Sequence, residues 1–198
     1  MPISNRIILT DVDGVLLEWE THFTKWMVSR GHKLKKEFKA EYDMQKRFVD
    51  ANEDIKLSIR EFNKSAWMGT QPPMPDSQTW VKLLHAEGWT FIPITSQTSD
   101  IPAQELRKRR LEELFGNVFY NFHILETGQD KDNVLAEFHG TGLYWVEDKW
   151  VNALAGLRYG LNPLFISHPY NQEYSHPEIT RVNNWKEIHT IIRNDERS

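Results

Sequence analysis

Two aspartates one residue apart, in the run Asp11-Val-Asp13-Gly14, are the residues of this sequence best suited to chemistry. They follow the apolar residues Ile7 to Leu9, which have the composition of a short buried strand. If that strand lies in an open parallel sheet, both carboxylates reach the crevice where such sheets bind ligands. Carboxylates can bind a metal ion, act as a covalent nucleophile or transfer a proton. Gly14 allows the chain to turn sharply away after them.

Much of the remaining sequence alternates between short apolar runs and segments with helical periodicity. The apolar runs predict strands, at 5–11, 89–94, 117–125, 142–146 and 163–167. The periodic segments predict helices, at 76–88, 101–115, 130–138, 149–159 and 184–192. Strands that alternate with helices pair in parallel. We therefore predict an α/β fold, a three-layer α/β/α sandwich around a Rossmann-like, mostly parallel sheet.

Residues 18–67 differ from the rest in being polar, charged and without a convincing strand. Their apolar residues recur with helical spacing, as at Phe23, Trp26 and Met27. A turn signal rich in glycine and proline follows at 69–75. We predict a small helical insertion at 18–67, inside a core domain formed by residues 1–17 and 68–198.

Polar side chains also stand at the ends of three later strands. They are Thr95 and Ser96 after the second strand, Lys131 after the third, and Glu147 with Asp148 after the fourth. Parallel strands place their carboxyl ends at one edge of the sheet. These side chains are therefore expected to converge on Asp11 and Asp13, although they are distant in sequence.

This ordered set resembles the haloacid dehalogenase superfamily over nearly the whole chain. The matching motifs are Asp11-Val-Asp13-Gly14-Val15, Ile94-Thr95-Ser96, Lys131, and Val146-Glu147-Asp148 with Asn152. The insertion at 18–67 occupies the position of the family's small helical cap of the C1 type. Asn152 departs from the pattern, because many members have a second acid there. The short spacing between Lys131 and Asp148 is a further departure.

The resemblance implies a role for each motif. Asp11 would be the nucleophile that forms an aspartyl-phosphate, and Asp13 the general acid and then base. Thr95, Ser96 and Lys131 would bind the phosphoryl group, with Lys131 neutralising its charge. Mg²⁺ would be held by Asp11, Asp148 and the backbone carbonyl of Asp13. The residues leave open whether Glu147 or Asn152 completes that metal site.

General chemistry also supports the use of carboxylates, a lysine and a metal ion for phosphoryl transfer. A carboxylate is ionised at neutral pH and would by itself repel a phosphate dianion. A magnesium ion and Lys131 reverse that repulsion and stabilise charge on the transferring group. Asp13 must be neutral to donate a proton, and nearby negative charge raises its pKa in that direction. Lys108, on the preceding helix, is the alternative to Lys131.

The implied function is a magnesium-dependent phosphomonoester hydrolase acting through an aspartyl-phosphate. The compact cap and His168-Pro-Tyr-Asn171 are similar to the 5'(3')-deoxyribonucleotidase-like branch, which points to nucleoside monophosphates as substrates. Aromatic residues of the insertion could stack on a base. The candidates are Trp19, Phe23, Trp26 and Trp67. The alternatives are a sugar-phosphate or nucleic-acid-end phosphatase, or an inactive phosphate-binding or interaction module.

Composition narrows the function classes further. The 198 residues include no cysteine, which excludes disulfides, thiolate catalysis and zinc–sulfur sites. The formal charge of −4 argues against a protein that coats nucleic acid, and the basic run 107–110 is interpreted as a solvated helix face. The sequence shows no signal peptide and no membrane-spanning run. We expect a cytoplasmic protein that binds a small phosphorylated substrate and no membrane. The sequence leaves open whether the protein forms a homodimer.

Overall fold

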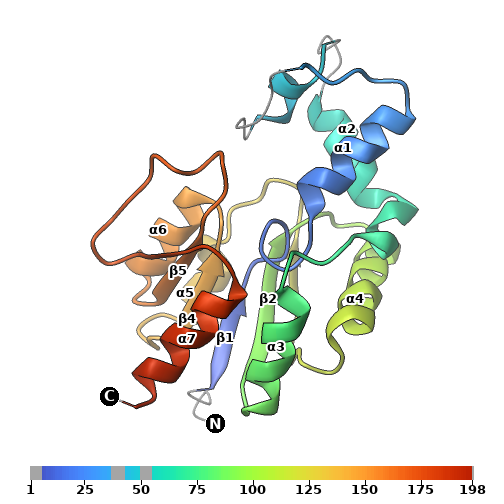
Figure 1. Ribbon diagram of the computed structural model, residues 1–198. Coiled ribbons are helices and arrows are strands. Elements are labelled where there is room, and N and C mark those ends of the chain that lie inside the picture. The colour runs from blue at the N-terminus through green and yellow to red at the C-terminus, as the bar shows by residue number, and fades with distance from the viewer. Residues whose placement is uncertain (1–5, 37–42, 50–54, 198) are drawn as a thin grey trace.

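The protein is described by a computed structural model that covers residues 6–36, 43–49 and 55–197. Its centre is one six-stranded sheet in the order β3-β2-β1-β4-β5-β6, and every pairing is parallel (Figure 1). The strands are β1 (Ile7–Thr10), β2 (Thr90–Ser96), β3 (His123–Leu125), β4 (Tyr144–Glu147), β5 (Asn162–Ile166) and β6 (Thr180–Val182). The predicted parallel sheet is confirmed.

Helices cover both faces of this sheet, because alternate residues of each strand point to opposite sides. Ile8 of β1 packs into one hydrophobic cluster, whereas Ile7 and Leu9 pack into another. The first cluster draws on α3 (Ser77–Ala86), α4 (Ile101–Phe115) and α7 (Trp185–Asp195). The second draws on α5 (Asp132–Ala136) and α6 (Trp150–Arg158). The α/β/α sandwich predicted from the sequence is therefore present.

The sheet differs from the prediction at both edges. The predicted third strand at 117–125 is reduced to β3, because the Asn121 carboxamide accepts the Phe122 backbone N–H, a group that a strand would pair. The edge strand β6 was not predicted. Its three residues, Thr180 to Val182, contain no apolar run and become a strand only by pairing with β5. Short edge strands of this kind carry little local signal.

The predicted insertion forms helices that stand beyond the carboxyl edge of the sheet (Figure 1). It contains α1 (Trp19–Ser29), η1 (Met44–Arg47) and α2 (Ile55–Lys64), and η2 (Ala66–Thr70) leads back to the core. Its helices share a hydrophobic cluster of their own, built largely from aromatic residues. Residues 37–42 and 50–54 of the predicted insertion lie outside the described residues.

Candidate active site

The Asp11–Gly14 segment leaves β1 at the carboxyl edge of the sheet and turns at once. The Asp11 backbone N–H donates to the Val146 carbonyl at 2.8 Å, so the segment is fastened to β4. Gly14 has a φ of +76°, and a Cβ there would lie 2.5 Å from Asp148 Oδ2. Glycine is therefore required twice, for the left-handed backbone and for the close approach of Asp148.

Lys131 lies between two carboxylates at the buried side of the site. Its Nζ is 2.8 Å from Asp11 Oδ1 and 2.9 Å from Glu147 Oε2. The lysine and Glu147 side chains are 2% and 0% exposed, so both charges are withdrawn from water. Lys131 thus reaches the Asp11 side chain, whereas the alternative, Lys108, pairs with Glu105 on an exposed part of its helix.

Glu147 is held by several donors from its own turn. Its Oε1 accepts the backbone N–H groups of Asp148 and Lys149, and its Oε2 accepts the Asn152 side-chain amide at 3.2 Å. The carboxylate therefore anchors Lys131 and shapes the start of α6. Asn152 points at Glu147 and also lines the cavity described below.

The acids of this cluster carry more negative charge than their surroundings neutralise. One oxygen from each of Asp11, Glu147 and Asp148 lies within 4.8 Å of the others. Burial and, next, the charge of Glu147 raise the pKa of Asp11 to about 7, while Lys131 opposes them. Burial and the charge of Asp11 raise the pKa of Asp148 to about 7. A divalent cation bound by oxygen ligands would relieve this excess, so the donor set fits Mg²⁺.

Asp13 occupies a separate environment on the other side of Asp11. Arg107 Nη1 lies 2.9 Å from its carboxylate and 3.3 Å from Thr95 Oγ1. Burial raises the pKa of Asp13, although Arg107 acts to lower it. Asp13 is thus paired one to one with a buried guanidinium, whereas Asp11 shares one lysine with two other acids.

The interpretation of residues 107–110 as a solvated face is wrong for Arg107. Its side chain is fully buried, while Arg109 on the same helix is exposed. The reason is helical spacing, because Ala103, Arg107 and Leu111 follow one another at intervals of four on the buried face of α4. Arg107 is a residue of the site that the sequence analysis missed, and its place in an apolar stripe was the available signal.

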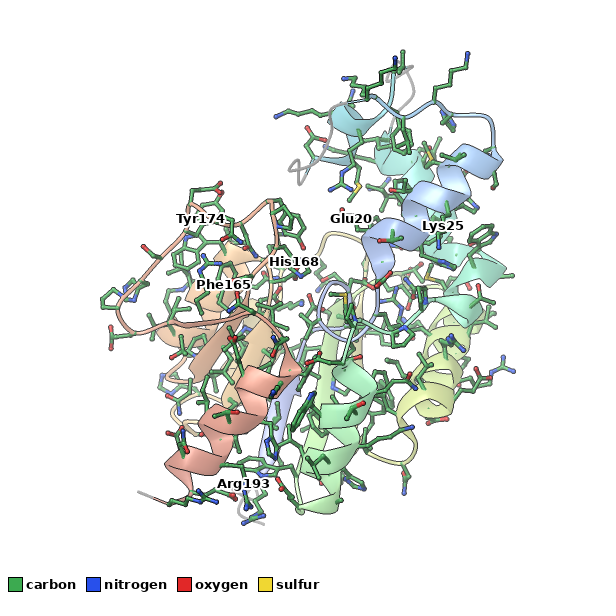
Figure 2. The ribbon with its side chains drawn as sticks, viewed as in Figure 1. Glu20, Lys25, Phe165, His168, Tyr174 and Arg193 are labelled. Atoms are coloured by element: carbon green, nitrogen blue, oxygen red, sulfur yellow. The ribbon has the colours of Figure 1, made fainter. Side chains whose placement is uncertain are left out.

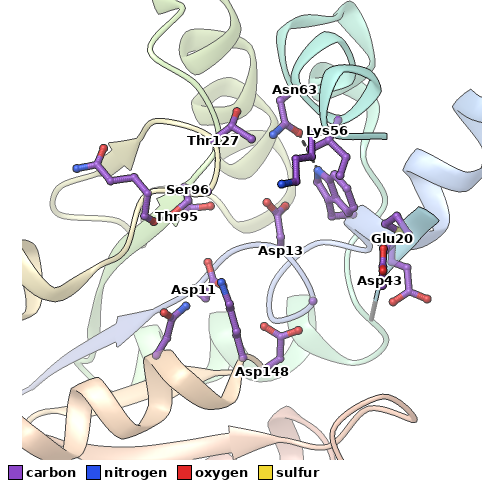
Figure 3. Close-up of a pocket in the computed structure, with 18 of the residues that line it drawn as sticks. Asp11, Asp13, Glu20, Asp43, Lys56, Asn63, Thr95, Ser96, Thr127 and Asp148 are labelled. Atoms are coloured by element: carbon purple, nitrogen blue, oxygen red, sulfur yellow. Dashed lines mark hydrogen bonds between the residues drawn. The ribbon is translucent and has the colours of Figure 1, made fainter. Parts of the chain in front are cut away.

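The two predicted phosphoryl-binding hydroxyls lie at the end of β2. Thr95 is buried, and its hydroxyl contacts Arg107 as described above. Ser96 is half-buried and donates from Oγ to the Gln129 carbonyl at 2.7 Å. Both residues line the cavity above the carboxylates, as Figure 3 shows.

A cavity of about 750 Å³ opens above these groups, between the core and the insertion (Figure 3). From the core it is lined by Asp11, Asp13, Lys131 and Asp148, together with other residues of the strand ends. From the insertion, its walls include Trp19, Glu20, Asp43, Lys56, Arg60 and Asn63. Its volume is in the range of pockets for small organic ligands.

The aromatic residues of the insertion that were predicted to contact the substrate occupy two different environments in the structure. Trp19 lines the cavity, and its Nε1 donates to Asn63 Oδ1 at 2.9 Å. Phe23 and Trp26 are instead buried in the aromatic cluster and are not among the described residues that line the cavity. Trp67 also packs against that cluster rather than lining the cavity. The three residues share one face of α1, but Trp19 is the first residue of the helix, whereas Phe23 and Trp26 lie further along it and are enclosed by the aromatic cluster.

Asn63 and Tyr170 are two further cavity residues that the sequence did not single out for the site. Asn63 joins Trp19 to the loop after β2, because its amide donates to the Gln97 carbonyl at 3.0 Å. Tyr170 donates its hydroxyl to Asp148 Oδ2. Polar residues of both kinds are common on surfaces, so composition and spacing alone do not mark them.

The described part of the chain, residues 6–36, 43–49 and 55–197, contains no helix with the length and apolar character needed to cross a bilayer. No protein-family model matches the sequence, and no curated protein sequence matches it either.

Solved structures do share the fold. A D,D-heptose 1,7-bisphosphate phosphatase from B. bronchiseptica, complexed with magnesium and phosphate, superposes with a TM-score of 0.62 at 13% identity, covering 96% of this chain and 99% of that one. CbbY from Rhodobacter sphaeroides in complex with phosphate gives 0.60 at 15% identity, covering 92% and 96%. A haloacid dehalogenase-like hydrolase from Streptococcus pneumoniae gives 0.61 at 14% identity, covering 94% and 98%. The chain therefore has the fold of haloacid dehalogenase-like hydrolases.

Proposed function

We propose that this protein is a magnesium-dependent phosphomonoester hydrolase that works through an aspartyl-phosphate on Asp11. The observation that carries the proposal is the buried cluster of Asp11, Lys131, Glu147 and Asp148, which opens into a cavity beside Asp13. An acid-rich cluster of this kind needs a cation, and the cavity offers space for an organic phosphate. The fold shared with a phosphatase that binds magnesium and phosphate supports the same proposal.

The first step transfers the phosphoryl group to Asp11. Its Oδ1 is engaged by Lys131 and by the Val12 backbone N–H, so Oδ2 is the oxygen left for attack on phosphorus. As the Oδ2–phosphorus bond forms, the bond from phosphorus to the ester oxygen breaks. The leaving alkoxide takes the proton of the Asp13 carboxyl group and departs as an alcohol.

The second step regenerates the enzyme. Asp13, now a carboxylate, accepts a proton from a water molecule as that water attacks the phosphorus of the aspartyl-phosphate. The bond between phosphorus and Asp11 Oδ2 breaks, and inorganic phosphate is released with Asp11 free again. Arg107 holds the Asp13 carboxylate in place for both proton transfers.

Charge neutralisation is shared between the chain and the metal. Lys131 offsets negative charge at Asp11 and on the phosphoryl oxygens, and Thr95 and Ser96 offer hydroxyls to the same group. A magnesium ion held by Asp11, Asp148 and the Asp13 carbonyl would supply the remaining positive charge. Glu147 serves this site as the anchor of Lys131, and Asn152 orients Glu147 in turn.

The insertion acts as a cap that selects the substrate. Trp19 presents an aromatic ring on the cavity wall, which favours a nucleoside monophosphate. A specific observation favours a second candidate: Lys56 and Arg60, one turn apart on α2, also line the cavity. Figure 3 shows the Lys56 side chain pointing from α2 toward Asp13. Such cations suit a sugar phosphate with a second anionic group, the class to which the heptose bisphosphate belongs by name.

A substrate panel tests the function and chooses between these candidates. Phosphate release is measured in Mg²⁺ with nucleoside monophosphates, hexose monophosphates and bisphosphates, and an oligonucleotide carrying a 3′-phosphate. The proposal expects hydrolysis of at least one class by the wild type, and none by Asp11→Asn. Hydrolysis undiminished in that variant would refute the aspartyl-phosphate. Magnesium binding without hydrolysis of any member would favour an inactive phosphate-binding module.

A further inference from the structure

The loop that follows β5 lies against the site, and the proposed mechanism assigns it no part. This loop, residues 167–176, leaves the sheet beside β4 and β6 and contains three aromatic or histidine side chains of interest: His168, Tyr170 and Tyr174. Figure 2 shows His168 on the side of the loop that faces the insertion, and Tyr174 at the outer part of the loop. One part of the loop, around His168 and Tyr170, therefore lies at the candidate metal site, and the part around Tyr174 lies away from it.

Tyr170 makes a direct contact with a carboxylate of the acidic cluster. Its hydroxyl donates to Asp148 Oδ2, and the tyrosine also lines the cavity. A Cβ on Gly14 would lie 3.3 Å from this hydroxyl and 2.5 Å from the same Asp148 oxygen. Tyr170 and Asp148 thus fill the space that Gly14 leaves open. This bond engages only one of the two oxygens of the Asp148 carboxylate and does not occupy Oδ1.

His168 fixes the ring of Tyr170 in this position. The two rings are stacked, with centroids 4.9 Å apart and planes 6° from parallel. His168 Nε2 lies 2.8 Å from the Gly14 carbonyl oxygen, an acceptor, so Nε2 must carry the proton and donate it. The stack therefore connects the turn after Asp13 with the carboxylate of Asp148.

Asn171 holds the loop on the sheet. Its side-chain amide donates to the carbonyls of Asp148 and Ile166, both at 2.9 Å, and its Oδ1 accepts the His168 backbone N–H at 2.9 Å. Asn171 is buried, so these bonds are shielded from water. The loop is thus fastened at the residue beside Tyr170, which limits the freedom of the Tyr170 hydroxyl.

We propose that Tyr170, held by His168, is a positioning residue that fixes the orientation of Asp148 and thereby raises the affinity of the site for Mg²⁺. The inference rests on the proposed function, which makes Asp148 a metal ligand. By donating to Oδ2, the tyrosine holds the carboxylate in one orientation and leaves Oδ1 for the ion. Groups that orient metal ligands in this way typically change metal affinity by about 10- to 100-fold.

The test is a calorimetric titration of the full-length protein with Mg²⁺ in the absence of substrate. Tyr170→Phe removes the hydroxyl and keeps the ring, and its Kd for Mg²⁺ is expected to rise about 10- to 100-fold. Tyr174→Phe is the matched control, because Tyr174 belongs to the same loop but stacks on Trp150 of α6. Its Kd is expected to equal that of the wild type. An unchanged Kd in folded Tyr170→Phe would overturn the inference.

Two variants of His168 separate its contributions. His168→Phe keeps a ring to stack on Tyr170 and loses the donor to Gly14, whereas His168→Gln keeps a donor and loses the stack. The inference expects a weaker affinity for Mg²⁺ in both, and less weakening than in Tyr170→Phe. Wild-type Kd values in both variants would remove His168 from the inference.

Turnover distinguishes failure of this inference from failure of the proposed function. If the wild type binds Mg²⁺ but hydrolyses no member of the panel, the proposed function fails, and the Kd ratio still decides the role of Tyr170. If it hydrolyses a substrate, Tyr170→Phe should need more Mg²⁺ for half-maximal rate and recover at saturating Mg²⁺. A wild type that binds no Mg²⁺ would refute both.

Discussion

The two aspartates of the Asp11–Gly14 segment are one residue apart, yet their charge environments are opposite. Asp11 shares a single buried lysine with Glu147 and Asp148, so three carboxylates face one cation. Asp13 instead meets one buried arginine, in a balanced pair. The first environment calls for an additional cation, and the second suits the proton transfer that we propose for Asp13. Alternation along a strand would place two residues at this spacing on the same side, so the bend that begins after β1 is what gives the two side chains different partners.

Among the variants that test this comparison, removal of the Asp11 carboxylate is expected to cause the largest loss of activity. Asp11→Asn keeps the shape of the side chain and loses the nucleophile, so kcat should fall on the order of 10⁴-fold or more. The variant should stay folded, because it lowers the excess negative charge beside Glu147 and Asp148. Phosphate release and circular dichroism measure the two outcomes. A variant that keeps more than a tenth of the wild-type rate would contradict the nucleophilic role.

Lys131→Met is expected to destabilise the acidic half of the site. It leaves Asp11 and Glu147 buried without their shared cation, and breaking a buried ion pair in this way costs about 3–5 kcal/mol. Urea denaturation at pH 8 with EDTA measures the loss. Lys108→Met is the matched control, because the exposed Lys108–Glu105 pair is worth about 0–1 kcal/mol. Equal stabilities of the two variants would show that Lys131 is not the cation on which the cluster depends.

The acidic half of the site also predicts how stability changes with pH. The folded-state pKa values of Asp11 and Asp148, about 7, lie above the ordinary value of 3.8. The folded state therefore binds more protons between about pH 4 and pH 7, and the free energy of unfolding contributed by these groups falls as the pH rises through that window. In EDTA the loss should be on the order of a few kcal/mol.

Magnesium should reduce that loss, because it stabilises the ionised carboxylates. Urea denaturation at pH 5, 6, 7 and 8, with EDTA and with Mg²⁺, measures both curves. Asp148→Asn supplies the reference for groups elsewhere in the chain, since it removes one of the two titrations. A wild type whose stability rises from pH 5 to pH 8 relative to Asp148→Asn would contradict the assigned environments.

The smallest loss of activity is expected from a change beside Asp13, whose charge is balanced by Arg107. Arg107→Gln removes the charge that favours ionised Asp13, so the pKa of Asp13 should rise further. The basic limb of the kcat profile, which reports the protonated acid, should then move to higher pH. Arg109→Gln is the control, because Arg109 is exposed on the same helix. The loss of kcat should be about 10-fold, and smaller for p-nitrophenyl phosphate, whose leaving group needs no proton. Coincident profiles for the two variants would contradict a role for Arg107 at Asp13.

Local patterns in the sequence determined the parallel α/β architecture and the position of the chemistry. Apolar runs and helical periods are read from neighbouring residues, and helix α4 has the predicted bounds, residues 101–115. The rule that parallel strands present their carboxyl ends at one edge of the sheet then predicts that Asp11, Lys131 and Asp148 lie together. The edge strand β6 lacked such a pattern, because it exists only through its pairing with β5.

Tertiary structure decided which side chains lie against which. Arg107 stands in a basic run and becomes a partner of Asp13 only because α4 turns that residue inward. Trp19 reaches the cavity while Phe23, on the same helix, packs inside the insertion. Tyr170 meets Asp148 across 22 positions of sequence. Residue type and spacing determine what a side chain can do, but its burial and charge partners come from segments that are distant in the sequence.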